Sequence, residues 1–185
     1  PIGSMFGNSH EIVECIQCLK GDGPEDTMEL VYAQADSLGY DIRTNIADGS
    51  ALAEFRSMCV RQGVTESDID DLIADPWSKL ERSTHSTEVP ATNSGWISDI
   101  HALTIGEILC KLGAGRTGEN SEINHGVGAE LLVRRGDFIE EGTSWIRFDT
   151  DARMTNETMD QIQQALTLSD SESQIPSRIL QIIEE

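Results

Sequence analysis

The chain has few basic residues for its length. Its 185 residues include 13 Lys plus Arg against 33 Asp plus Glu, which gives a formal net charge of -20. Nucleic acids and anionic membranes are bound through clusters of Lys and Arg, so this balance argues against both as partners. The three lysines are Lys20, Lys79 and Lys111, and each is predicted to lie at a helix end or on the surface.

Long hydrophobic runs are missing too. No stretch approaches the roughly 20 apolar residues of a membrane-spanning helix, and the N-terminus lacks the basic start and apolar core of a secretory signal. Hydrophobic residues make up 38% of the chain and charged residues 25%, which is typical of a soluble globular protein. We therefore expect a cytoplasmic protein with a substantial core.

The sequence also has few groups of residues that could bind a metal ion or form a redox-active cysteine pair. Cys15 and Cys18 have suitable spacing, but the pattern is helical and no second Cys or His pair follows, so we predict that they pack as small apolar groups. Asp68, Asp70 and Asp71 lie close together, yet a charged helix start accounts for them. We predict no required cofactor.

The stretch from Ser94 to Phe148 organises the sequence. Gly95 opens a predicted strand, and residues 102–112 switch to helical spacing of apolar residues. Gly113 occupies the position where a helix C-cap needs positive φ. Two further strands follow, separated by the Gly136–Asp137 turn. This order of elements predicts one compact α/β unit.

The N-terminal segment predicts a second ordered region. Residues 8–19 are expected to form a helix, with Asn8 as its N-cap and Glu11 completing a capping box. The predicted apolar face of this helix consists of Ile12, Cys15, Ile16 and Leu19.

The remaining pattern is mainly helical. Residues 25–38, 49–58, 65–74 and 156–168 are predicted helices, residues 39–48 a polar turn region, residues 81–93 a linker, and residues 179–183 part of a short terminal element. Ser50 is the predicted cap of the second of these helices.

Two ordered sets of motifs resemble the thymidine and pyrimidine nucleoside phosphorylase family. The first set resembles the family's central domain, and the second resembles its C-terminal domain. The first set is Pro1-Ile2-Gly3, Gly7-Asn8, Glu11 with Glu14, Leu19-Lys20-Gly21, Gly23-Pro24 and the helix from Gly49 to Gly63. The second is Gly95-Trp96-Ile97-Ser98, Leu112-Gly113-Ala114-Gly115-Arg116, Ile123 with His125-Gly126-Val127-Gly128, Gly136-Asp137 and Glu141-Gly142.

The resemblance implies an α/β (α+β) fold in two parts. Residues 1–80 would be the C-terminal part of a central α/β domain, 81–93 a linker, and 94–185 a hammerhead-like barrel-sandwich domain. It implies a transferase of nucleotide salvage, active as a homodimer, that converts thymidine or a related pyrimidine nucleoside and phosphate into free base and pentose 1-phosphate. The family's phosphate- and base-binding motifs lie upstream of Pro1, so the chain is expected to be an inactive fragment by itself.

The resemblance also suggests site residues. Gly113, Gly115, Arg116 and Thr117 would form a lid near the substrate cleft, with a surface ion pair of Arg116 as the simpler alternative. The backbone carbonyls of Ile2 and Met5 and the carboxylate of Glu14 would hold a monovalent cation such as potassium, although Glu14 equally fits a solvated helix position. His125 is expected to be structural.

Two other functions fit parts of the pattern. A catalytically inactive binding or scaffold module with the same fold would explain the shortened segment around residues 39–48. A lipoyl or biotinyl carrier uses similar Gly-Asp and Glu-Gly turns, but no lysine follows Lys111 to carry the cofactor.

Overall fold

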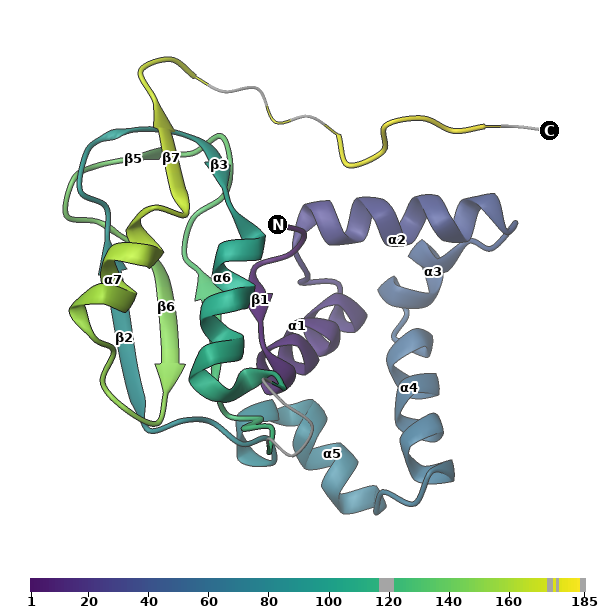
Figure 1. Cartoon of the computed structure of the whole chain (residues 1–185). Coiled ribbons are helices and arrows are strands. Elements are labelled where there is room, and N and C mark those ends of the chain that lie inside the picture. Colours follow the sequence, from purple (N-terminus) through teal and green to yellow (C-terminus); the bar gives the residue numbers. More distant parts are fainter. Residues whose placement is uncertain (117–121, 173–174, 176, 184–185) are drawn as a thin grey trace. The chain divides into compact units, whose positions relative to one another are not determined.

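The computed structural model describes residues 1–116, 122–172, 175 and 177–183 (Figure 1). These residues form two compact units. One unit, here called the sheet unit, contains Gly3–Glu11 and Glu81–Ile175, and the other, the helical unit, contains Ile12–Leu80 and the described residues after Ile175. No helix within the described ranges is long and apolar enough to cross a membrane.

The larger sheet of the sheet unit is antiparallel and has the strand order β1-β4-β6-β2. Its strands are β1 (Met5–Phe6), β2 (His85–Pro90), β4 (Gly128–Leu131) and β6 (Ser144–Thr150). Phe6 pairs with Ala129, and Ala129 pairs with Phe148. The N-terminal segment thus enters this sheet as an edge strand, although more than 100 residues separate it from β4 along the chain.

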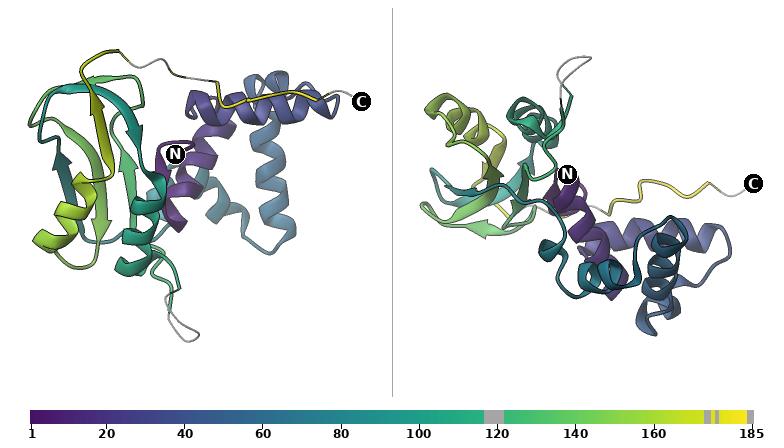
Figure 2. Two further views of the ribbon diagram at one scale, coloured as in Figure 1. Left: turned by 45° about the horizontal axis from the view of Figure 1, so that its top comes forward. Right: turned by 90° about the horizontal axis from the view of Figure 1, so that it is seen from below.

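The smaller sheet is also antiparallel, with the order β5-β3-β7. Its strands are β3 (Gly95–Ile100), β5 (Phe138–Ile139) and β7 (Leu166–Ser169). Helix α6 (Ala102–Leu109) continues into one π-helical turn, η2 (Cys110–Ala114), and helix α7 (Asn156–Gln163) lies beside α6 (Figure 2). Both the predicted strand at Gly95 and the helix that ends at a positive-φ Gly113 are confirmed.

Apolar residues from both sheets and both helices form one core in the sheet unit. Strands β3, β4 and β6 each supply two or more of these side chains. Burial of this area is the main favourable term in folding the unit. Among the largest fully buried side chains are Trp145, Phe148, Ile97, Ile105, Ile146 and Ile162.

The helical unit has a smaller core. It contains most of α1 (Asn8–Lys20), then α2 (Glu25–Ser37), α3 (Ile42–Ala47), α4 (Ser50–Arg61), α5 (Glu66–Ala74) and the single turn η1 (Pro76–Ser78). Its buried apolar side chains within the described ranges are Val13, Ile16, Met28 and Ile69. The fold class is therefore mixed helix and sheet, as predicted.

Three predictions of local structure were wrong. Residues 39–48 contain α3, because the Asp41 side chain caps it by accepting a hydrogen bond from the backbone N–H of Arg43. Residues 81–93 were predicted to be a linker, but they contain β2, which pairs along β6. The predicted helix 156–168 ends at Gln163, and Leu166–Ser169 pairs with β3 instead. Tertiary pairing decided these last two stretches.

The predicted apolar face of helix α1 is buried only in part. Val13 and Ile16 are buried, whereas Ile12 and Cys15 are exposed. The four cysteines are free, and Cys18, Cys59 and Cys110 are half-buried, so packing as small apolar groups holds in part. Burial, reinforced by Glu14, raises the pKa of Cys18 to about 11, which keeps this thiol protonated and unreactive at neutral pH.

The N-cap of α4 also differs from the predicted one. The helix begins at Ser50 and its N-cap is Gly49 with φ 79°, so the cap position lies one residue before the predicted one. Helix α5 is capped by Thr65, whose side chain accepts from the backbone N–H of Asp68.

Candidate functional site

The first turn of α1 is fixed to the sheet unit by its backbone. The first N–H groups of a helix have no partner within the helix and must find one elsewhere. Here the N–H of Ser9 donates to the carbonyl of His125 at 3.3 Å, and the N–H of Gly7 donates to Glu11 Oε1 at 3.2 Å. Glu11 therefore reaches back across the turn as predicted, but to Gly7, because the helix already begins at Asn8.

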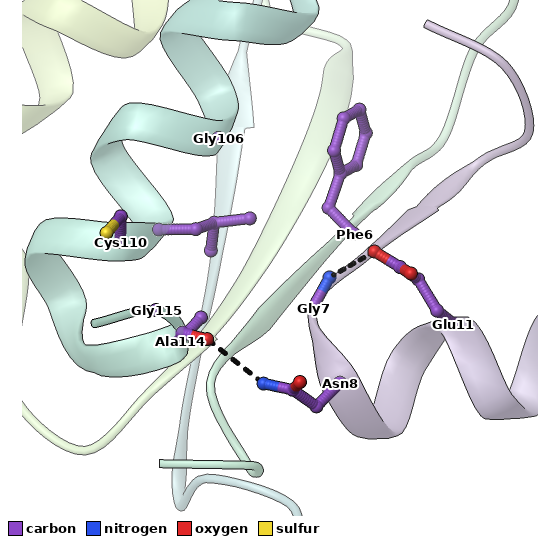
Figure 3. Close-up of a pocket in the computed structure, with 9 residues that line it drawn as sticks. Phe6, Gly7, Asn8, Glu11, Gly106, Cys110, Ala114 and Gly115 are labelled. Carbon is purple, nitrogen blue, oxygen red and sulfur yellow. Dashed lines mark hydrogen bonds between the residues drawn. The ribbon is translucent and has the colours of Figure 1, made fainter. Parts of the chain in front are cut away.

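The side chain of Asn8 bonds to a residue that is distant along the chain. Its Nδ2 donates to the carbonyl of Ala114 at 3.0 Å, across 106 residues of sequence (Figure 3). Ala114 belongs to the glycine loop, defined here as Gly113–Arg116. The predicted capping role of Asn8 was therefore wrong, and its amide instead joins α1 to this loop.

Two backbone features shape the glycine loop. Gly113 has φ +114°, a conformation that side chains other than glycine rarely adopt. A Cβ at Gly115 would lie 2.8 Å from Cys110 Sγ, so only glycine lets the chain pass so close to that thiol. The carbonyl of Gly113 accepts from the N–H of Asn124 at 2.9 Å, and Cys110 Sγ lies 3.6 Å from the carbonyl of Arg116 as its donor.

A pocket of about 210 Å³ lies between the start of α1 and the end of α6 (Figure 3). Glu11 and Asn8 supply its polar side chains, and Phe6 and Leu109 supply apolar ones. This mixture of an apolar wall and a few polar groups resembles a small-molecule site, but the volume is below the range of about 300–1,000 Å³ that is usual for such sites. The lining residues are Phe6, Gly7, Asn8, Glu11, Gly106, Leu109, Cys110, Ala114 and Gly115.

Substitution of Gly106 tests whether helix α6, which forms one wall of the pocket, has open space beside this residue. It lies inside α6, and a Cβ added there would meet nothing within 4 Å. Gly106→Ala is therefore expected to raise the free energy of unfolding by about 0.5–1 kcal/mol, the helix-propensity difference between the two residues. Urea denaturation followed by tryptophan fluorescence measures this change. A loss of stability would show instead that a neighbouring group occupies the space beside Gly106.

Behind the first turn of α1 lies a buried charged cluster. His10 Nε2 is 3.1 Å from Asp149 Oδ2, and Arg82 Nε donates to the same oxygen at 2.7 Å. The side chains of His10 and Asp149 are only 2% and 1% exposed. Burial by itself would raise the pKa of Asp149, but the hydrogen bonds from His10 and Arg82 outweigh it and hold this pKa well below its ordinary value.

Glycine at position 128 makes room for this cluster. A Cβ on Gly128 would lie 2.1 Å from His10 Nδ1 and 2.6 Å from two ring carbons. The ring of His10 therefore packs directly against the backbone of β4. The contact joins the N-terminal segment to the centre of the larger sheet.

The predicted lid residues fall only partly within the described chain. Gly113 and Gly115 shape the glycine loop, Gly115 also lines the pocket, and Arg116 is exposed at the end of the loop. Thr117 lies outside the described residues. Of the predicted residues within the described ranges, Gly115 lines the pocket, whereas Gly113 and Arg116 belong to the same loop but do not line it.

The predicted cation ligands fall in both compact units. Met5 is in β1 of the sheet unit, whereas Ile2 and Glu14 belong to the helical unit. Within the described ranges, no group of three or more His, Cys, Asp or Glu side chains could hold a metal ion.

The three aspartates of α5 serve as partners of cations on their own unit. Lys79 Nζ is 2.8 Å from Asp68 and 3.0 Å from Asp71, and Arg56 Nε is 2.6 Å from Asp70.

Sequence reasoning missed His10, Arg82 and Asp149 as a cluster. One signal was available: His10, Val13 and Ile16 follow at intervals of three, so His10 shares the buried side of α1. No local pattern linked it to Asp149, which lies 139 residues further along the chain.

Comparison with known proteins gives two results that agree. Residues 96–169 match the pyrimidine nucleoside phosphorylase C-terminal domain family. The chain is 32% identical over 199 residues to a pyrimidine-nucleoside phosphorylase of Staphylococcus epidermidis, covering 100% of this chain and 44% of that protein. It is 31% identical to the Bacillus subtilis protein of the same name, with the same coverage.

A human relative shows a similar level of identity. The chain is 31% identical over 188 residues to the thymidine phosphorylase of Homo sapiens, covering 92% of this chain and 39% of that protein. The chain spans less than half the length of each of these curated relatives.

Proposed function

Because the chain belongs to the pyrimidine nucleoside phosphorylase family, we propose that it is the C-terminal part of an enzyme that cleaves pyrimidine nucleosides with phosphate. Thymidine and phosphate would give thymine and 2-deoxyribose 1-phosphate. A phosphate oxygen bonds to C1′ of the sugar while the bond from C1′ to the base nitrogen breaks, and the base leaves with the electron pair and takes up a proton. The observation that carries this proposal is similarity along the whole chain to named phosphorylases.

The chain alone is proposed to be inactive. Phosphorolysis needs cations and N–H donors around phosphate and around the departing base. Most arginines of the described structure already face carboxylates, and Lys20 and Lys79 bond within the helical unit. The paired arginines are Arg43, Arg56, Arg61, Arg82, Arg147 and Arg178. The phosphate and base sites would therefore come from polypeptide that the relatives have and this chain does not.

Within the whole enzyme, the glycine loop is proposed to cover the substrate cleft. Gly113 and Gly115 give it a shape that other residues would strain, and Arg116 offers an exposed guanidinium at its end. Thr117 would extend this lid. Carbonyls of Ile2 and Met5 with the carboxylate of Glu14 are proposed as half of a site for a monovalent cation such as potassium, since such ions prefer oxygen ligands.

The finer architecture and setting are proposed on the same family grounds. The sheet unit would be a hammerhead-like barrel sandwich, which its two antiparallel sheets support. The whole enzyme would be a cytoplasmic homodimer of nucleotide salvage. The alternative function is an inactive scaffold module of the same fold. It is favoured because most of the Arg and Lys side chains described above are already paired or hydrogen-bonded.

Thymine release decides between the two. We would incubate thymidine with the purified 185-residue chain and with the product of its full open reading frame, each with and without phosphate. Phosphate-dependent release by the full product alone is the expected result. Release by the short chain would mean that it holds a complete catalytic set, and no release by either would favour the scaffold module.

A further inference from the structure

We propose that Asn8 is a positioning residue: its side-chain amide holds the glycine loop, and through the loop Arg116, in the place where the proposed phosphorolysis needs it. The inference rests on the proposed function for its catalytic consequence. The contact behind it is independent of that function, because both partners are described residues of the sheet unit (Figure 3).

The glycine loop is held at three of its four carbonyls. Gly113 accepts from Asn124 and Arg116 accepts from Cys110, both from nearby sequence. Ala114, between them, accepts from Asn8, on a helix that begins 106 residues earlier. Of these three contacts, the bond from Asn8 is the one that ties the loop to a distant element.

Asn8 can fix the loop because Asn8 is itself held firmly. The next two residues, Ser9 and His10, are buried, with Ser9 bonded through its N–H to His125 and His10 bonded to Asp149. The amide of Asn8 therefore projects from a turn anchored to the core of the sheet unit. A movement of the loop away from the pocket would break this bond before it displaced the helix.

The chemistry of the contact requires an amide or another donor. A carbonyl only accepts, so Nδ2 of asparagine can bind it and a carboxylate cannot. Asp has the same shape as Asn and is favourable near a helix N-terminus. Asn8→Asp therefore keeps the helix start while it replaces the donor with a repelling acceptor, which separates loop positioning from folding.

Thiol labelling tests the contact directly. Cys110 lines the pocket and touches the loop, so its alkylation by iodoacetamide reports how often the loop moves away. Loss of one hydrogen bond is expected to raise the Cys110 rate by about two- to tenfold in Asn8→Asp. Cys59, half-buried in the helical unit, serves as the internal reference and should keep its rate.

Two further variants complete the labelling experiment. Asn93→Ala is the matched control, since that amide bonds only to its neighbour Thr92 in the described structure. Asn8→Ala removes the donor without adding charge and should match Asn8→Asp. An unchanged Cys110 rate in both Asn8 variants would overturn the proposal. An equal rise at Cys110 and Cys59 in both variants would overturn it too, because that pattern reports general unfolding.

The catalytic part is tested by a double-mutant cycle in the product of the full open reading frame. Asn8→Asp and Arg116→Ala are each expected to lower kcat/KM for thymidine by about tenfold, as a misplaced group does. If Asn8 acts through Arg116, the double variant will match Arg116→Ala alone. Additive losses would overturn the proposal. A full product without phosphorolysis would refute the proposed function, while the Cys110 rates would still decide whether Asn8 holds the loop.

Discussion

Asp149→Ala is expected to lower the free energy of unfolding of the sheet unit by about 3 kcal/mol or more. The carboxylate is buried and bonds to both His10 and Arg82. Removing it leaves the buried imidazole of His10 without this carboxylate. Removing one member of a buried pair lowers the free energy of unfolding far more than removing one member of a surface pair. Urea denaturation monitored by fluorescence of buried Trp145 measures the change.

Asp99→Ala supplies the control for this substitution. Asp99 is also a strand residue, but it is exposed, so its replacement should change stability by less than about 0.5 kcal/mol. A loss below about 1 kcal/mol for Asp149→Ala would contradict the view that this cluster fastens α1 to the sheet.

The contribution of Asp149 also depends on pH. Its pKa in the folded protein lies below the unfolded value of about 4, so the unfolded state binds the proton more tightly. The stabilisation is therefore complete above about pH 5 and is lost as the pH falls through the two pKa values. The gap in stability between wild type and Asp149→Ala should accordingly narrow below about pH 4.

Gly128→Ala is expected to cost about 3 kcal/mol. The added Cβ would overlap the ring of His10, which is buried and cannot swing into solvent without leaving Asp149. Overpacking alone typically costs about 1–3 kcal/mol, and displacement of the buried pair adds to it. Thermal or urea unfolding reports the loss, and Gly106→Ala, where the new methyl group has open space, is the matched glycine control.

A second substitution identifies the cause. In a His10→Ala background the ring is gone, so Gly128→Ala should then cost less than about 1 kcal/mol. An equally large cost in that background would place the strain in the backbone of β4 rather than at His10.

Much of the local structure could be predicted because its determinants are local. Gly95 and the bulky residues after it predict β3, and the spacing of apolar residues through Leu109 predicts α6. Gly113 ends that helix with positive φ because its own missing side chain permits it. The same reasoning failed where the local sequence fits a helix and a strand equally well, as at Leu166–Ser169. This stretch became a strand only because β3 offers an unpaired edge.

The candidate site was predicted in part. Motif resemblance pointed to Gly113, Gly115 and Arg116, and the first two shape the glycine loop. The role of Asn8 was mistaken, because a short polar side chain before a helix usually caps it. Its actual partner, Ala114, is a backbone carbonyl, which carries no sequence signal.

The sequence by itself determined the acidic surface, the positions of most helices, the turns that need glycine, and the resemblance to the phosphorylase family. These follow from side-chain chemistry, periodicity and φ preferences within a few residues. Only the tertiary structure decided that Gly3–Glu11 adds an edge strand to the larger sheet and that His10 meets Asp149. Such contacts join residues more than 100 positions apart, and their energy arises from burial and hydrogen bonding that exist only after the chain has folded.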